Sequence, residues 1–338
     1  MRIRFATRSL PTATPQKLVK LVEEVPRIGK AEYHFYKDLL GQIEEDSEEE
    51  LPHHEHIVNL FIEISEFMLR VGAFLDDKCQ PDEEIILELM QCPFSALKKS
   101  SFLLLKSLYE RNLVARQPPK IYSELLGYRL EPAADLNALV CGDLSTYLFT
   151  WQALLLRKDA TERPPLSEDD LDIKLEEYIS SEGYSDLLIK NCFVLLDDKL
   201  EYLKNEADYP ITPENLLEAD YEVNMLEDEE GNMQMKVFRM AVRTLFLFVG
   251  NFPMFLRDFM DHHKKYKNIC DRLLRTVISE AIFQQEVGRI EVLEPQWKAD
   301  GNFEIYVTPK NKEIYAEYTH DVVRIGLRLT LRGNYPLS

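Results

Sequence analysis

Apolar residues recur three and four positions apart through most of this 338-residue sequence, which places them on one face of a helix. Within His56–Leu75 the apolar stripe covers about a third of the helix surface. The same spacing predicts helices over Asp82–Gln91, Phe94–Asn112, Asp143–Arg157, Glu168–Ile179, Ser185–Leu203, Lys236–Asp258 and Tyr266–Gln285. A long series of helices with little strand between them favours a helical solenoid of the HEAT or armadillo kind. A closed helical domain is the alternative fold.

The spacing changes near Pro295, where apolar and polar residues begin to alternate. Alternation is the pattern of a half-buried strand, and turn residues separate the segments. The expected strands are Phe303–Thr308, Ile314–Tyr318 and Val323–Leu331, in an antiparallel meander. Three strands with one apolar face do not complete a domain. Because the sequence stops seven residues after Leu331, we expect it to be cut inside a small α+β domain.

Cysteine usage and hydropathy narrow the class of protein. The five cysteines (79, 92, 141, 192 and 270) form no C-x-x-C pair, which argues against a disulfide scaffold and a zinc module. Reduced, mostly buried thiols in a cytosolic or nuclear protein are expected instead. No apolar run approaches the roughly 18 residues of a membrane span. The first 22 residues are free of acidic side chains, which leaves import into an organelle as an alternative.

Charge is unevenly distributed. The whole chain has a formal net charge of −19, but residues 233–338 contain 16 Lys and Arg against 12 Asp and Glu. Residues 1–232 therefore carry a net −23, partly in acidic runs at 44–50, 167–170 and 227–230 that we expect to be solvated loops. Such asymmetry can orient a protein at a charged partner.

No catalytic motif is present: the sequence has no Gly-rich phosphate loop, no G-x-S-x-G and no H-E-x-x-H. Neighbouring histidines in His53–His56 would lie on different faces of a helix, so we expect no metal site there or at Asp261–His263. Trp151 lies on an apolar helix face and is expected in the core. Cofactor and catalytic residues are therefore not expected in this chain.

Basic side chains are the remaining candidates. A dense group comprises Lys264, Lys265, Lys267, Arg272 and Arg275, and its two interpretations are the solvent face of a helix and contact with phosphate. Three arginines, Arg324, Arg328 and Arg332, alternate with the apolar residues of the third strand and are expected to project together from its polar face.

Several segments over residues 90–338 resemble the listerin family, the RING-type E3 ubiquitin ligases of ribosome-associated quality control. Asp143–Leu156 is similar to a stretch of that family's late helical repeats, and Cys92–Leu97 leading into Phe102–Leu105 to the helix opening before it. Arg243–Phe259 resembles the helix before the family's RWD domain. Three further segments of this chain resemble the family's RWD strands and their Asn-Tyr-Pro-Leu turn: Lys312–Tyr318, Val323–Leu331 and Asn334–Leu337. One departure is Phe259-Met260, where the family usually carries a tryptophan pair.

We expect an N-terminal helical segment and acidic loop (1–52) and HEAT-like repeats (53–290), and the resemblance implies a partial RWD-like domain (291–338). It also implies a cytosolic ligase that binds the 60S ribosomal subunit carrying a stalled nascent chain, works with the other ribosome quality control proteins, and ubiquitinates the nascent chain with an E2 held by its RING. The cysteines present cannot supply the paired zinc sites of a RING, so zinc is expected only in that missing module. We therefore expect this chain to dock and to be inactive alone, with Lys264, Lys265, Lys267, Arg324, Arg328 and Arg332 as candidate ribosome contacts. A non-enzymatic α-solenoid adaptor is the alternative function.

Overall fold

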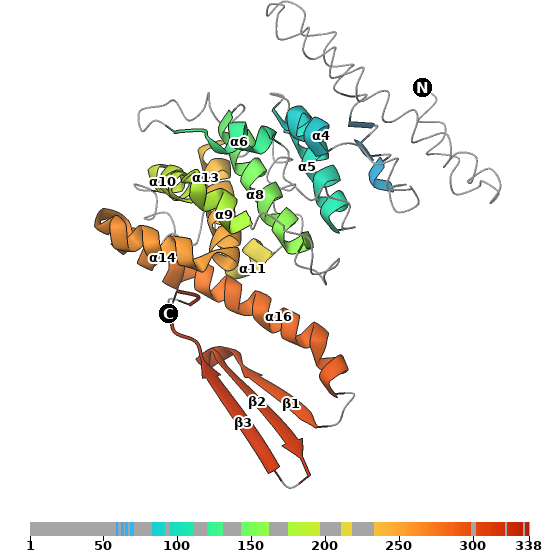
Figure 1. Ribbon diagram of the computed structural model, residues 1–338, viewed down its shortest axis with the longest axis vertical. Helices are drawn as coiled ribbons and strands as arrows, with labels where there is room; N and C mark the ends of the chain where they lie inside the picture. The colour runs from blue at the N-terminus through green and yellow to red at the C-terminus, as the bar shows by residue number, and fades with distance from the viewer. Residues whose placement is uncertain are drawn as a thin grey trace, which may run out of the picture. The chain divides into compact units, whose positions relative to one another are not determined.

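The computed structural model describes a defined part of the chain: residues 59, 62–63, 65–66, 68–70, 83–91, 95–110, 120–130, 143–161, 175–196, 211–217, 233–298, 302–321, 323–333 and 335–337. These residues are mostly helical, with one small antiparallel sheet, as the sequence predicts (Figure 1). The chain divides into two compact units. Unit 1 contains residues 1–184 and 222–237, and unit 2 contains residues 185–221 and 238–338.

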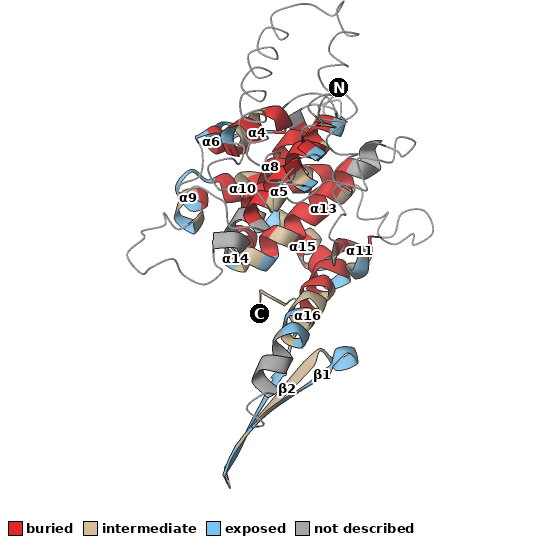
Figure 2. Ribbon diagram, turned by 90° about the vertical axis from the view of Figure 1, so that its right-hand side faces the viewer, coloured by how far each residue is buried: buried red, intermediate tan, exposed pale blue. Residues whose placement is uncertain are grey.

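Unit 1 is a group of helices around α8. Its helices are α4 (Glu83–Met90), α5 (Ser95–Glu110), α6 (Ile121–Leu126), α8 (Asp143–Thr161) and α9 (Leu175–Ser181). Helix α5 packs against α4 and α8, and α6 packs against α8. Every residue from Leu144 to Leu155 is buried, so this part of α8 has neighbours on all sides (Figure 2). Trp151 is fully buried there, which confirms its predicted place in the core.

Two helices begin in unit 1 and lie mostly in unit 2: α10 (Tyr184–Leu196) and α13 (Met233–Asn251). It also contains α11 (Pro213–Leu217), α14 (Pro253–His262), the 3₁₀ turn η6 (Lys264–Tyr266), α15 (Lys267–Leu273), the π-helical segment η7 (Leu274–Ile278) and α16 (Ser279–Lys298). Helix α11 packs against α16. The core of unit 2 consists of buried side chains such as Phe193, Leu245, Phe248, Phe259 and Ile282.

One predicted helix, Lys236–Asp258, is wrong as a single element. Phe252 leaves the helical conformation (φ −137°, ψ 58°), and Pro253 opens α14 in a new direction. Proline lacks the backbone N–H that a continuing helix needs, and it disfavours helical backbone at the preceding residue. The apolar spacing hides this break because Phe252 stays buried, with its ring centroid 5.6 Å from that of Phe248.

Two other boundaries differ from the prediction. The expected helix Tyr266–Gln285 is a run of α15, η7 and α16 that extends past Pro295 to Lys298, so the change of period there does not mark the helix end. Pro295 lies in the last turn of this helix. The short helices α6 and α11 were not predicted because five or six residues are too few to show a repeating apolar spacing.

No single described helix is both long and apolar enough to cross a membrane. Helices α13 and α14 meet that test together, by length and composition, but they are bent by 106° relative to one another.

The predicted meander is confirmed. Strands β1 (Phe303–Thr308), β2 (Glu313–His320) and β3 (Val323–Thr330) form an antiparallel sheet in the order β1-β2-β3. Ile305, Ala316 and Leu327 lie in one row across it. Helix α16 packs against β1, and an ion pair of 2.8 Å joins Lys312 Nζ in the β1–β2 turn to Glu280 Oε2 on α16 (Figure 1).

Candidate docking surface

The three candidate lysines lie together at one corner of unit 2. Lys264 and Lys265 are in η6, the tight turn between α14 and α15, and Lys267 begins α15. All three side chains are exposed. The sequence predicted their proximity and exposure, and we call this group the lysine corner.

Aromatic side chains pack against the turn that carries the lysine corner. The Tyr266 ring stacks on Phe193 of α10 and Phe259 of α14, with centroid distances of 5.6 and 5.7 Å. The imidazole of His263 lies 4.5 Å from the Phe259 ring. Ring pairs of this kind contribute about 0.5–1.5 kcal/mol each beyond their burial, so the turn is held by side chains from three elements. Sequence reasoning missed this support, because Phe193 is about 70 positions away from it in the chain.

The charges at the lysine corner are only partly compensated. The ammonium of Lys265 lies over the Tyr266 ring, 4.4 Å from its centroid. Asp186 of α10 faces His263, with 3.6 Å between Oδ2 and Nε2. Within the described residues, the side chains of Lys264 and Lys267 form no hydrogen bond or ion pair. Two exposed ammonium groups are therefore available to an anion.

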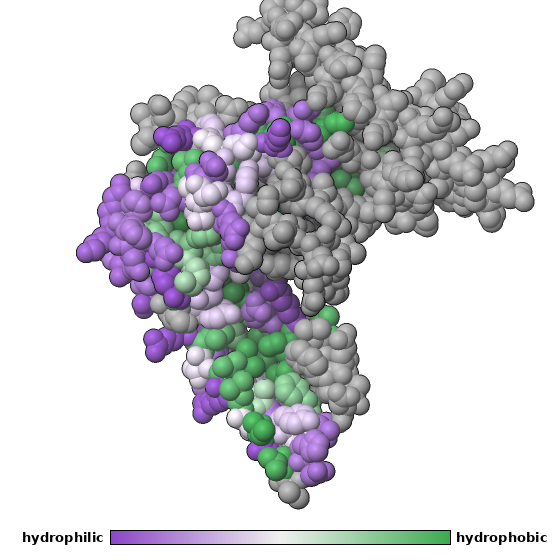
Figure 3. All heavy atoms as spheres, in the orientation of Figure 1, coloured by the Kyte–Doolittle hydropathy of each residue, from purple (hydrophilic) through white to green (hydrophobic). Residues whose placement is uncertain are grey.

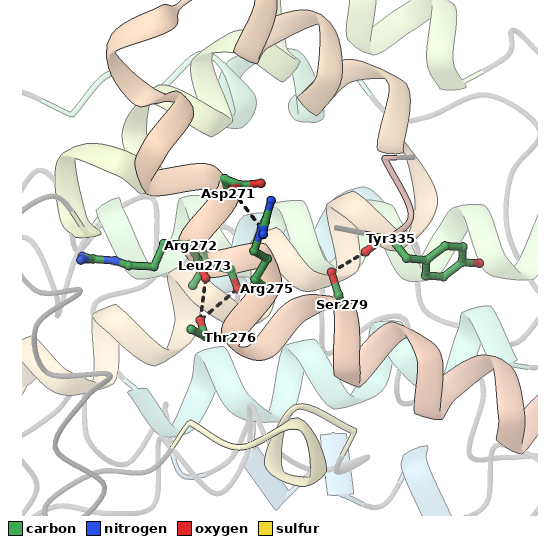
Figure 4. A network of polar contacts seen from close by, with 7 residues as sticks. All are labelled: Asp271, Arg272, Leu273, Arg275, Thr276, Ser279 and Tyr335. Carbon is green, nitrogen blue, oxygen red and sulfur yellow. Dashed lines mark hydrogen bonds and ion pairs between the residues drawn. The ribbon is translucent and has the colours of Figure 1, made fainter. Parts of the chain in front are cut away.

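The basic group continues along the next helix, where Figure 4 shows Arg272 and Arg275 on α15 and η7. Arg275 is paired with Asp271 at 3.0 Å, whereas the Arg272 side chain projects away from that pair. The N–H of Ser279 bonds the carbonyl oxygen of Leu274, five residues earlier, which is the wide turn of a π-helix. Arg272 thus extends the exposed positive charge beyond the lysine corner.

The C-terminal residues are fixed to this helical run. Ser279 Oγ donates a 2.5 Å hydrogen bond to the carbonyl oxygen of Tyr335 (Figure 4). Arg257 Nη2 donates one of 2.7 Å to the carbonyl oxygen of Leu337. The segment that resembles the Asn-Tyr-Pro-Leu turn therefore docks on α14 and on the start of α16. No sequence pattern predicted these contacts.

The arginines on the sheet are in a different electrostatic state. Arg328 Nη2 lies 2.7 Å from Glu313 Oε1, and Arg324 Nη1 lies 3.5 Å from Glu317 Oε1. Both arginines are on the polar face of β3, as predicted, but each is partly neutralised by a glutamate of β2. Exposed pairs of this kind contribute about 0–1 kcal/mol, so a stronger anion could compete for the arginines.

Arg332 does not belong to the polar face of the strand. Strand β3 ends at Thr330, and Arg332 lies in the following turn, where its carbonyl oxygen accepts a 3.0 Å hydrogen bond from the N–H of Tyr335. Alternation fails here because the chain turns toward α16. No hydrogen bond or ion pair in the described part of the chain joins the three arginines to the lysine corner.

Two tyrosines lie between the glutamates on the same face. Tyr306 and Tyr315 stack with 6.3 Å between ring centroids. Their hydroxyls donate to Glu304 and Glu317 respectively, and these hydrogen bonds raise the pKa of both tyrosines. This mixture of carboxylates, rings and guanidinium groups is less suited to phosphate than the lysine corner.

Buried polar side chains in unit 1 form a network that sequence reasoning also missed. Tyr109 Oη lies 2.9 Å from Glu83 Oε1, to which it donates, and 2.8 Å from the hydroxyl of Tyr122. Burial, followed by the nearby Tyr122 and Glu83, raises the pKa of Tyr109 well above its usual value. Lys98, also buried, donates to the hydroxyls of Ser145 and Thr146 at 3.1 and 2.6 Å. Both sets join different helices in the interior of unit 1.

Metal-ligand geometry is not found in the described residues, where no three Asp, Glu, His or Cys side chains gather. His262 and His263 diverge: the first bonds the carbonyl oxygen of Asp258, and the second faces Asp186. Cys192 and Cys270 are buried free thiols, and burial raises the pKa of Cys270 to about 12. His53–His56, the three acidic runs and the other three cysteines lie outside the described residues.

No protein-family model matches the chain, and no curated protein matches it in sequence.

Proposed function

We propose that this chain is the scaffold and docking portion of a listerin-type E3 ubiquitin ligase in the cytosol, with HEAT-like repeats followed by an RWD-like sheet. Its partners are the 60S ribosomal subunit with its stalled nascent chain, the ribosome quality control proteins, and the E2 enzyme that binds the ligase's RING. The RING directs ubiquitin from the E2 enzyme to the nascent chain, whereas this chain positions the ligase on the 60S subunit.

The lysine corner is the observation that carries the docking proposal. Its exposed ammonium groups stand on a turn held by the aromatic rings of Phe193, Phe259 and Tyr266. A rigid base lowers the entropy lost when the side chains bind. Ribosomal RNA offers dense phosphate, and each lysine that neutralises one phosphate releases a condensed counterion.

The charge distribution gives the docking an orientation. Residues 1–232 carry a net −23, which phosphate repels, whereas residues 233–338 carry 16 basic against 12 acidic residues. The end of the chain with the lysine corner would therefore approach the RNA first.

The test compares the chain with its variant Lys264→Glu, Lys265→Glu, Lys267→Glu in binding to purified 60S subunits over a salt titration. We expect weaker binding and a shallower salt dependence, since each lost phosphate contact lowers the slope of log K against log salt by about 0.7–0.9. The matched control, Lys120→Glu, Arg289→Glu, Lys310→Glu, makes the same charge change at exposed positions outside the corner. Equal affinity and slope for the corner variant and the unchanged chain would overturn the proposal.

A non-enzymatic adaptor that binds a protein is the second candidate, because aliphatic side chains of β3 are exposed: Val323, Ile325, Leu327 and Leu329. An adaptor of this kind would bind its partner through apolar contacts, and its affinity would change little with salt.

A further inference from the structure

The helix that carries Lys267 contains a single acidic residue. Mostly hydrophilic side chains cover α14 on the face shown in Figure 3, and the chain continues from α14 into η6 and α15. In η6 and α15, residues 264–273, only Asp271 has a carboxylate. Asp271 lies four positions after Lys267 and four positions before Arg275, so both cations are within its reach on the same side of the helix. The partner that Asp271 takes therefore decides whether Lys267 is free to bind a phosphate.

Asp271 pairs with Arg275. The distance from Arg275 Nε to Asp271 Oδ2 is 3.0 Å, and Figure 4 shows the two side chains joined. In the part of the chain that the structure describes, the Lys267 side chain forms no hydrogen bond or ion pair. Helix geometry favours this choice, because an acid four positions before a base is a better pair than the reverse order and agrees with the helix dipole.

An unpaired Asp271 would disturb phosphate binding. At 3.6 residues per turn, Asp271 lies about 40° from Lys267 around the helix axis, and Arg272 lies about 140° from it. Asp271 thus stands between two exposed cations, Lys267 on one side and Arg272 on the other. A phosphate bound at Lys267 would be close to the carboxylate, and the two negative charges would repel one another.

Arg275 is well placed to neutralise this carboxylate. The helix neighbours of Asp271 are the residues three and four positions away, and two of them, Asn268 and Leu274, carry no charge. The other two are Lys267 and Arg275. Arg275 is therefore the neighbour that can neutralise Asp271 without engaging Lys267.

We propose that Arg275 is a positioning residue for docking, which holds Asp271 away from Lys267 so that the lysine ammonium can bind an RNA phosphate. This inference rests on the proposed function, because it assigns a role within the same docking surface. Arg275 itself touches no phosphate, and its effect on binding passes through Asp271. The side chains of the pair are 62% and 39% exposed, so its loss should change the affinity for RNA and leave the fold intact.

The first test compares variants of the whole chain in binding to purified 60S subunits. Arg275→Ala should bind more weakly than the matched control Arg289→Ala, which removes a similarly exposed ion pair, with Glu286 at 3.1 Å, from α16. Both variants lose one positive charge and one surface pair, so the difference between them reports the effect of Asp271. We expect their dissociation constants to differ by about 1.5- to fivefold at low salt, the usual strength of a surface ion pair. Arg275→Lys keeps a cation four positions after Asp271 and should restore most of the affinity.

The Asp271→Asn background tests how Arg275 acts. No carboxylate remains there to be held, so Arg275→Ala should weaken binding no more than Arg289→Ala does. A loss in this background as large as in the unchanged chain would overturn the proposal, because Arg275 would then act on the RNA directly. Equal losses for Arg275→Ala and Arg289→Ala in the unchanged chain, or no recovery with Arg275→Lys, would also overturn it.

The triple variant Lys264→Glu, Lys265→Glu, Lys267→Glu is measured in the same series, so that the two proposals can be separated. If it binds as the unchanged chain does, the docking proposal fails and the role of Arg275 fails with it. If it binds weakly while Arg275→Ala matches Arg289→Ala, docking at the lysine corner stands and only the role of Arg275 is overturned. Circular dichroism checks that each variant keeps its helices.

Discussion

Tyr315 covers Gly326 on the neighbouring strand so closely that a Cβ at position 326 would lie 2.8 Å from the tyrosine hydroxyl oxygen. The two residues are on the polar face of the sheet, where the Tyr315 hydroxyl also donates a 3.0 Å hydrogen bond to Glu317. A side chain at position 326 would therefore require the exposed Tyr315 ring to shift.

Gly326→Ala should force the Tyr315 ring to move and to give up its hydrogen bond to Glu317. Because the ring is at the surface and alanine loses less backbone entropy than glycine in a strand, we expect only a small fall in the free energy of unfolding. Urea denaturation measures it. In the Tyr315→Phe background the closest atom is absent, so the same substitution should cost less. Equal costs in both backgrounds would show that the ring does not restrict position 326.

Tyr109→Phe should destabilise unit 1 by about 1–3 kcal/mol, because the buried Glu83 carboxylate loses its 2.9 Å donor. The change should also alter how the free energy of unfolding depends on high pH. The pKa of Tyr109 is raised in the folded chain, so the unfolded chain releases this proton first, and stability falls as the pH rises above about 10.

The free energy of unfolding measured at pH 9 and pH 11 should therefore fall less in Tyr109→Phe than in the unchanged chain. Tyr178→Phe is the comparison variant. Burial raises the pKa of Tyr178 to about 12, so this change should also reduce the fall in stability, although the Tyr178 side chain is only partly buried. An undiminished fall in Tyr109→Phe would contradict a buried, protonated Tyr109.

Sequence patterns predicted the elements whose cause is local. Alternation alone located β1 and β3, since every second side chain of these strands is apolar. The bend at Phe252 was missed because a buried aromatic residue continues the apolar spacing while Pro253 changes the backbone direction. Arg332 was placed on the strand because the alternation continues beyond the last residue of β3, Thr330.

The candidate site shows the same limit. The exposure of Lys264, Lys265 and Lys267 follows from charge, which is local information. The ring that supports their turn, Phe193, comes from a helix far away in sequence, and no spacing encodes that contact. Likewise, Arg324 was expected on the polar face of the third strand, but its partner Glu317 is identified only by the register of β2 with β3.

Phe259→Ala should cost about 3–5 kcal/mol in the free energy of unfolding, because the ring is buried and a cavity would remain beneath the lysine corner. The ring stacks on Phe193, Tyr266 and His263, so its loss removes the contacts that fix η6 against α10. Met254→Ala on the same helix is the control. Its side chain is 54% exposed, so a change within about 0.5 kcal/mol is expected.

A milder change separates packing from docking. Phe259→Leu keeps most of the apolar volume, so it should cost less than Phe259→Ala while still removing the ring stacking on Tyr266. If rigid presentation of the lysines matters, this variant should bind 60S subunits more weakly at every salt concentration but with an unchanged salt slope, since all the cations remain. Chemical denaturation and subunit binding measure the two effects. A Phe259→Leu variant with full affinity would show that the aromatic base stabilises the fold without contributing to docking.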